Sequence, residues 1–149
     1  MDSFRFKKKY GQNFLVDKNI VTKIVSDIEI LPDSLVVEIG CGDGKLTKVL
    51  CEKFDEVIGY EIDLDVKENL FANLSGFDNF EIIFDDFLKR NIVSDIKNVN
   101  YDNLYIIANL PYYITTPIIE KIVSSCLNIN MIRIIEQKEV GDRFCAKVG

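Results

Sequence analysis

The feature that most constrains the fold of this sequence is a regular alternation of short apolar runs with longer amphipathic segments. The apolar runs predict strands at residues 35–39, 56–60, 80–84, 104–108 and 131–135. Apolar side chains at helical spacing predict helices at residues 17–28, 45–54, 64–74, 116–127 and 138–147. Because strands that alternate with helices form βαβ crossovers, we expect an α/β fold with a mostly parallel sheet and helices on both faces.

The composition supports one packed domain and excludes several other classes of protein. With 149 residues, of which 48% are hydrophobic, the chain is long enough for one core but short for two. Its longest apolar run is far below the about 18 residues that a membrane-spanning helix requires, so we expect no membrane segment. The four cysteines have no C-x-x-C spacing and there is no histidine, which argues against a metal site and favours free thiols in a reducing cytoplasm.

Charge is distributed unevenly along the chain, whose net charge is −6. Arg5 and the run Lys7–Lys9 make residues 1–16 basic, whereas the remainder is acidic. An acidic body binds nucleic acid poorly by itself, because contacts to phosphates supply most of that affinity. The basic segment is therefore interpreted either as a solvated tail or as part of a nucleic-acid interface.

A glycine-rich turn, Gly40-Cys41-Gly42-Asp43-Gly44, follows the first predicted strand. Glycines at a strand–helix junction let the backbone bend tightly and approach a ligand closely. The spacing differs from the G-x-G-x-x-G of nicotinamide-dependent enzymes, and no G-K-[ST] follows, which excludes a P-loop. The turn indicates either a ligand-binding loop or an ordinary tight connection.

Acidic residues follow the next two predicted strands. Glu61 ends the second strand, where a carboxylate can accept both ribose hydroxyls of a nucleoside cofactor. Asp85 and Asp86 follow the third, where a carboxylate can accept the exocyclic amine of adenine. A helix cap for Glu61 and ordinary loop polarity for the aspartates are the alternative interpretations. Together with the glycine turn, these acids predict a cofactor pocket at the carboxyl edge of the sheet.

The tetrapeptide Asn109-Leu110-Pro111-Tyr112, after the fourth predicted strand, indicates the reaction. An aromatic amine is a poor nucleophile because its lone pair is delocalised into the ring. Two acceptors on its N–H groups, the Asn109 side-chain oxygen and the Leu110 carbonyl oxygen, would favour a pyramidal nitrogen with an available lone pair. Pro111 fixes the backbone, and Tyr112 can stack on a base, which contributes about 1–3 kcal/mol. A proline turn beside a packed tyrosine is the alternative.

As a set, these residues resemble the ribosomal RNA adenine dimethyltransferase family of S-adenosylmethionine-dependent enzymes. The resemblance spans nearly the whole chain and includes residues 11–17 (GQNFLVD), 109–117 (NLPYYITTP) and 137–140 (QKEV). The run 109–117, with its final proline, resembles the housekeeping (KsgA-like) branch, which modifies two adjacent adenosines near the 3′ end of small-subunit rRNA. The Erm-like resistance branch modifies one adenosine of large-subunit rRNA and typically lacks the matching proline.

The resemblance implies a Rossmann-like class I methyltransferase fold with S-adenosylmethionine as cofactor. The implied cofactor-binding residues are Asn13, Leu15, Gly40, Gly42, Glu61, Ile62, Asp86, Phe87 and Asn109. The implied catalytic residues are Asn109, Leu110, Pro111 and Tyr112. For the adenine ring, Asp86 is preferred to Asp85 because the sequence from Asp86 onward matches the family pattern D-x-L-K better.

Members of this family continue past this point with further strands and a helical domain that helps to bind rRNA. The resemblance implies that residues 17–149 are a methyltransferase catalytic domain lacking those parts, preceded by a basic segment, residues 1–16, with a cofactor-contacting turn. It further implies a monomeric cytoplasmic enzyme of ribosome biogenesis that acts on small-subunit rRNA in a 30S-type particle, with no metal and no membrane. This chain alone is expected to bind the cofactor but to methylate rRNA poorly.

Three other functions stay open on the sequence. The first is an Erm-like large-subunit rRNA methyltransferase. The second is a non-enzymatic nucleic-acid-binding relative of the same fold, against which the retained Asn109–Tyr112 motif argues. The third is a methyltransferase acting on amines of small molecules or DNA.

Overall fold

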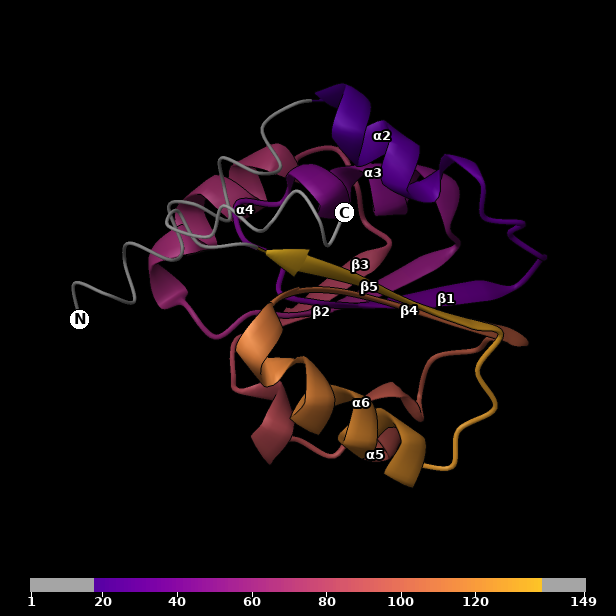
Figure 1. The fold of residues 1–149 in the computed structure, drawn as a ribbon. Helices are drawn as coiled ribbons and strands as arrows, with labels where there is room; N and C mark the ends of the chain where they lie inside the picture. Colours follow the sequence, from indigo (N-terminus) through magenta and orange to yellow (C-terminus); the bar gives the residue numbers. More distant parts are fainter. Residues whose placement is uncertain (1–17, 138–149) are drawn as a thin grey trace.

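The computed structural model describes residues 18–137 of the chain. Five strands of this part form one sheet in the order β3-β2-β1-β4-β5, and every neighbouring pair is parallel (Figure 1). The strands are β1 (Ser34–Ile39), β2 (Glu56–Tyr60), β3 (Phe80–Ile83), β4 (Asn103–Pro111) and β5 (Met131–Gln137). The predicted parallel sheet is confirmed, and each of the five predicted strands is present.

Helices cover both faces of the sheet, as predicted. One face is covered by α2 (Lys18–Ser26), α3 (Lys45–Lys53) and α4 (Lys67–Asn73), and the other by α5 (Ile92–Ile96) and α6 (Thr115–Ser124) (Figure 1). Short 3-10 helices follow the carboxyl ends of β2, β3 and β4, at η1 (Leu64–Val66), η2 (Phe87–Lys89) and η3 (Tyr112–Ile114).

Each face of the sheet has its own hydrophobic core, because strands of a parallel sheet are buried on both sides. On the face above the sheet in Figure 1, Val21 of α2 and Leu50 of α3 belong to the same buried cluster as Val36 of β1. On the opposite face, Ile122 of α6 shares a cluster with Val37. Neighbouring residues of β1 therefore serve opposite cores, as the pleat of a strand requires.

The order of the strands determines where a ligand can bind. The chain order reverses between β1 and β4, and ligands of open α/β sheets bind outside the carboxyl ends of the strands at such a point. The register places Ile39 at the end of β1 beside both Tyr60 of β2 and Ala108 of β4. The loops that leave β1 and β2, and the last residues of β4, therefore meet at one edge.

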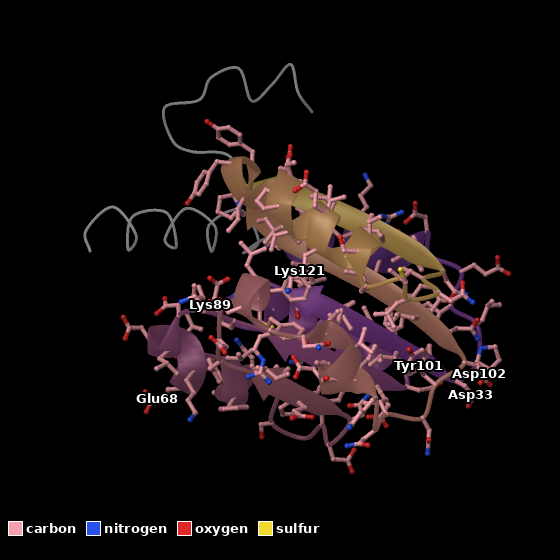
Figure 2. All side chains as sticks on the ribbon, turned by 90° about the horizontal axis from the view of Figure 1, so that it is seen from below. Asp33, Glu68, Lys89, Tyr101, Asp102 and Lys121 are labelled. Atoms are coloured by element: carbon pink, nitrogen blue, oxygen red, sulfur yellow. The ribbon has the colours of Figure 1, made fainter. Side chains whose placement is uncertain are left out.

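Figure 2 shows the two ends of the sheet from below. Asp33 and Asp102, which precede β1 and β4, lie with Tyr101 at the end where these strands begin. Glu68 and Lys89, which follow β2 and β3, lie toward the opposite end. The predicted site residues within the described part of the chain follow or end these strands and therefore lie toward this second end, which is the carboxyl edge.

Strand β4 extends well beyond its predicted end, and this changes the setting of the catalytic motif. The prediction ended the fourth strand at Ala108, because asparagine and proline are poor strand formers. In the structure, β4 continues to Pro111, since β5 pairs with it as far as the partners Pro111 and Gln137. Asn109, Leu110 and Pro111 therefore belong to the end of the strand rather than to a loop after it.

Other elements differ at their ends or were not predicted. The predicted helix 64–74 consists of η1 followed by α4, and it begins where the Asp63 side chain accepts a hydrogen bond from Asp65 N (2.9 Å). Helix α5 was missed because its five residues are too few for a periodic pattern. It begins where Asn91 accepts a hydrogen bond from Ser94 N (3.1 Å).

Several predictions fall outside the described residues. These are the basic segment 1–16 with its domain boundary, the start of the first helix at Asp17, and the helix 138–147. In residues 18–137, no helix is long and apolar enough to cross a membrane. Cys41 and Cys51 are buried free thiols, and Cys126 is an exposed one.

Candidate functional site

The glycine turn after β1 lies directly against the end of β4. Gly40 has a positive φ of 89°, and its N–H donates to the Tyr60 carbonyl oxygen of β2 (2.8 Å). A Cβ atom at Gly40 would overlap the backbone carbonyl oxygen of Asn109. Glycine is therefore required at this position both for its conformation and for the close approach of the two segments. Two of the motifs that the sequence singled out thus meet in space.

Glu61 leaves the end of β2 and turns toward the glycine turn. Glu61 is 8% exposed, and its carboxylate accepts hydrogen bonds from Gly42 N (2.7 Å) through Oε1 and from Asp63 N (2.9 Å) through Oε2. Burial raises the pKa of Glu61 above its ordinary value, and the hydrogen bonds from the backbone oppose that rise. A carboxylate has about four acceptor positions, so these bonds leave capacity for the hydroxyls of a ligand.

The two aspartates after β3 have different surroundings. Asp85 accepts a hydrogen bond from Asp86 N (2.7 Å) and forms an ion pair with Arg90 (3.5 Å). Asp86 caps η2 by accepting a hydrogen bond from Leu88 N through Oδ1 (3.0 Å). The charge of Asp85 is thus already paired with a guanidinium, whereas no ion pair of Asp86 is found among the described residues. This difference supports Asp86 as the ligand-binding acid.

Two predicted cofactor residues next to these acids differ in exposure. Ile62, which follows Glu61, is 59% exposed and offers an apolar surface at the carboxyl edge. The ring of Phe87 is buried at 3% exposure and packs edge-on against Tyr60, with ring centroids 4.9 Å apart. Only the backbone of Phe87 could therefore contact a bound ligand.

The end of β4 presents a buried amide and an exposed aromatic ring. Asn109 and Leu110 are each 5% exposed, and Pro111 directs the chain into η3 with φ −60° and ψ 141°. Tyr112 is 54% exposed and Tyr113 is 52% exposed, with the two rings nearly perpendicular at 79°. An amide fixed in a strand beside a projecting ring is suited to hold a planar base.

Glu38 is a buried acid outside the set of predicted site residues. It lies in β1 beneath the glycine turn, is fully buried, and accepts a hydrogen bond from the Thr47 hydroxyl of α3. Burial raises the pKa of Glu38 to about 8, although the hydrogen bonds from Thr47 and Cys41 act in the opposite direction. The signal in the sequence is one acid within an otherwise apolar strand.

Not every predicted site residue can be placed. Asn13 and Leu15 lie outside the described residues, so their proposed contacts stay predictions. Gly40, Gly42, Glu61 and Asn109 lie together at the meeting point of β1, β2 and β4, as their motifs suggested. Within residues 18–137, no group of three or more acidic, cysteine or histidine side chains could hold a metal ion.

Comparisons with known sequences identify the relatives of this chain. The sequence model of the family described as "Ribosomal RNA adenine dimethylase" matches residues 3–149. Ribosomal RNA small subunit methyltransferase A of Lactococcus lactis is 43% identical over 145 residues, which cover 96% of this chain and 49% of that protein. The protein of the same name from Aster yellows witches'-broom phytoplasma is 47% identical, with 95% of this chain and 52% of that protein covered. The chain spans about half the length of these curated relatives.

Solved structures share the fold. A dimethyladenosine transferase from Plasmodium falciparum superposes with a TM-score of 0.66 at 28% identity, covering 87% of this chain and 45% of that one. The 23S rRNA methyltransferase ErmE superposes with a TM-score of 0.57 at 31% identity, covering 78% of this chain and 43% of that one. The predicted Rossmann-like methyltransferase fold is confirmed, and the chain belongs to the ribosomal RNA adenine dimethylase family.

Proposed function

We propose that this chain contains the cofactor-binding and catalytic site of an S-adenosylmethionine-dependent enzyme. The reaction is N6-dimethylation of two adjacent adenosines near the 3′ end of small-subunit rRNA. The observation that most supports this function is the direct approach of the Asn109 backbone to Gly40, which sets the base-binding motif against the glycine turn. A cofactor on that turn and a base beside Asn109 would lie next to each other.

The residues around the glycine turn fit a nucleoside cofactor. A Cβ atom at Gly42 would have no atom of the described residues 18–137 within 4 Å beyond its own chain neighbours, so this part of the chain leaves space over the turn. Glu61 is positioned for two ribose hydroxyls, Asp86 for the adenine amine, and Ile62 for the apolar face of the ring. When bound, S-adenosylmethionine supplies an electrophilic methyl group.

The role of this chain is to orient the adenine amine, and no charged side chain is needed to remove a proton from it. The Asn109 side-chain oxygen and the Leu110 carbonyl accept the N–H groups of the adenine amine and favour a pyramidal nitrogen. Tyr112 stacks on the base, which must leave its own stack to enter the site. Because the methylated amine is acidic, it can release its proton to water without help from a side chain.

Small-subunit rRNA is favoured over large-subunit rRNA by the closer relatives. Proteins named small subunit methyltransferase A are 43% and 47% identical to this chain, whereas ErmE is 31% identical. The proposed partner is accordingly the rRNA of a 30S-type particle. The enzyme is proposed to bind it as a monomer in the cytoplasm. The basic residues Arg5 and Lys7–Lys9 would contribute contacts to phosphates.

Replacing Asn109 with alanine tests the proposed function. In the natural protein that contains this sequence, we expect the single-turnover rate on unmethylated small subunits to fall on the order of 100-fold, because the amide acts mainly in the transition state. Affinity for the cofactor is expected to change much less. Wild-type methylation of large-subunit RNA alone would instead favour the resistance-type activity, and an undiminished rate in the variant would remove Asn109 from catalysis.

Replacing Glu61 with alanine tests the cofactor site. The variant loses the acceptors for two hydroxyls and the hydrogen bond that Gly42 N donates to Glu61. We therefore expect affinity for S-adenosylhomocysteine to fall about 10- to 150-fold. Glu61→Gln retains the shape and one acceptor and is expected to lose less. Calorimetry of the 149-residue chain measures both, with thermal unfolding as the check that each variant is folded. Unchanged affinity in Glu61→Ala would exclude Glu61 from the site.

A further inference from the structure

Arg90 connects the loop that follows β3 to helix α5. Its Nε and Nη2 atoms donate to the two carboxylate oxygens of Asp95, at 3.2 and 2.8 Å. Its Nη1 atom donates to Asp85 Oδ2 at 3.5 Å. A planar guanidinium can hold two carboxylates in fixed directions in this way, which an ammonium group cannot. Arg90 therefore restrains the direction of the Asp85 side chain, through a contact longer than its two bonds to Asp95.

The same group of residues reaches the end of β2. The Tyr60 hydroxyl donates to Asp95 Oδ2 (2.7 Å), and the Tyr60 ring packs edge-on against Phe87. Tyr60 is 1% exposed and immediately precedes Glu61. Arg90 and Asp95 thus tie the segment that bears the ribose acid to the segment that bears the adenine acid.

The ionic states of the group are consistent with this connection. Burial opposes ionisation of Asp95, but the hydrogen bonds from Arg90 and Tyr60 outweigh it and leave the pKa of Asp95 below its usual value. The hydrogen bond and the charge of Asp95 raise the pKa of Arg90. Because the Arg90 side chain is 36% exposed, its ion pair with Asp95 adds little to the stability of the fold. Its main effect is to orient the side chains that it joins.

We infer that Arg90 is a positioning residue for Asp86, acting through Asp85, and that it sets how well the site recognises the 6-amino group of a purine. The inference rests on the proposed function, in which Asp86 accepts that amine. Asp85 Oδ1 accepts a hydrogen bond from Asp86 N (2.7 Å), and Arg90 donates to the other carboxylate oxygen of Asp85. Without Arg90, Asp85 can rotate, Asp86 N loses its acceptor, and a second unpaired carboxylate stands beside the amine site.

The test compares two ligands that differ only at the 6-position. These are S-adenosylhomocysteine and its analogue in which hydrogen replaces the 6-amino group. Calorimetry on the 149-residue chain gives the ratio of the two affinities for wild type, Arg90→Ala, Arg90→Lys and Asp85→Asn. Arg133→Ala is the matched control, since Arg133 of β5 also pairs with an aspartate (2.7 Å), in this case Asp27, which directly follows α2.

Wild type is expected to prefer the amino ligand. In Arg90→Ala, affinity for S-adenosylhomocysteine is expected to fall about 5- to 20-fold, while affinity for the analogue changes less than twofold. The ratio of the affinity for S-adenosylhomocysteine to that for the analogue therefore falls. In Arg90→Lys and Asp85→Asn we expect a smaller fall in this ratio. Arg133→Ala should leave the ratio unchanged.

Each other outcome has a distinct meaning. If Arg90→Ala weakens both ligands equally, Arg90 is only structural and the inference is wrong. If that variant does not fold, an unchanged ratio in Arg90→Lys and Asp85→Asn overturns the inference in the same way. Failure of the wild-type chain to bind S-adenosylhomocysteine contradicts the proposed function itself. Binding by wild type without any effect of Arg90 contradicts only the inference.

Discussion

Replacing Gly40 with alanine is expected to lower the free energy of unfolding by about 2–5 kcal/mol. The new Cβ would overlap the Asn109 carbonyl oxygen, and φ at Gly40 is +89°, a region that alanine adopts only with strain. The carbonyl cannot easily move aside, because Asn109 pairs with Ile135 in the ladder between β4 and β5. Since domains are stable by only about 5–15 kcal/mol, this loss is large. Denaturant unfolding of the two chains measures it.

Gly42→Ala is the matched control for this prediction. Gly42 also has a positive φ, +57°, but a Cβ there would meet no other described residue within 4 Å. We expect a loss of only about 1–2 kcal/mol from backbone strain, with at least a tenfold loss of affinity for S-adenosylhomocysteine because the methyl group enters the space over the turn. Equal stability of the two variants would show that the Asn109 carbonyl can yield. Full affinity in Gly42→Ala would show that the cofactor does not cross the turn.

The parts of the fold that the sequence predicts well are those with a local signal. Strand β2 (Glu56–Tyr60) is a buried run after its first residue, and α3 has apolar residues at helical spacing, so both were predicted close to their actual ends. Where pairing with a neighbouring strand determines the end of an element, the local sequence pattern does not predict that end. Strand β4 runs through Asn109 to Pro111 only because β5 offers partners there, against the strand preference of those residues.

The candidate site likewise has features that the sequence predicts and features that it does not. The sequence could bring Gly42 and Glu61 to one edge, because each follows a parallel strand. It could not predict that the Glu61 carboxylate would accept a hydrogen bond from Gly42 N, since this depends on the path of two loops. The contacts of Arg90 with Asp85 and Asp95 depend likewise on α5, a helix without a periodic signal.

Glu38 gives rise to the second large effect, a loss of stability on raising the pH. Its pKa is about 8 in the folded chain and near its ordinary value, 4.5, when unfolded. Between these values the folded state binds more protons than the unfolded state, so the free energy of unfolding falls as pH rises. The contribution is complete below about pH 4.5 and is lost as pH passes through about 8, by at most roughly 5 kcal/mol.

The physical reason is that the β1 site favours a neutral carboxyl group. The Glu38 side chain is fully buried, and its Oε2 atom accepts no hydrogen bond from the described part of the chain. Glu61 and Asp43 add negative charge nearby and act in the same direction as burial, whereas the Thr47 hydroxyl and the Cys41 thiol favour the anion. Because burial is the largest of these influences, the neutral form prevails near neutral pH.

Glu38→Gln mimics the neutral carboxyl at every pH and therefore separates this group from the others that titrate. We expect the melting temperature of wild type to fall between pH 6 and pH 9, and that of Glu38→Gln to fall less and to exceed wild type at pH 9. Glu56→Gln, at an exposed position of β2, should follow wild type throughout. Parallel curves for wild type and Glu38→Gln would mean that Glu38 is ionised in the folded chain. The glycine turn would then lie above a buried negative charge, and a bound sulfonium would be attracted to it.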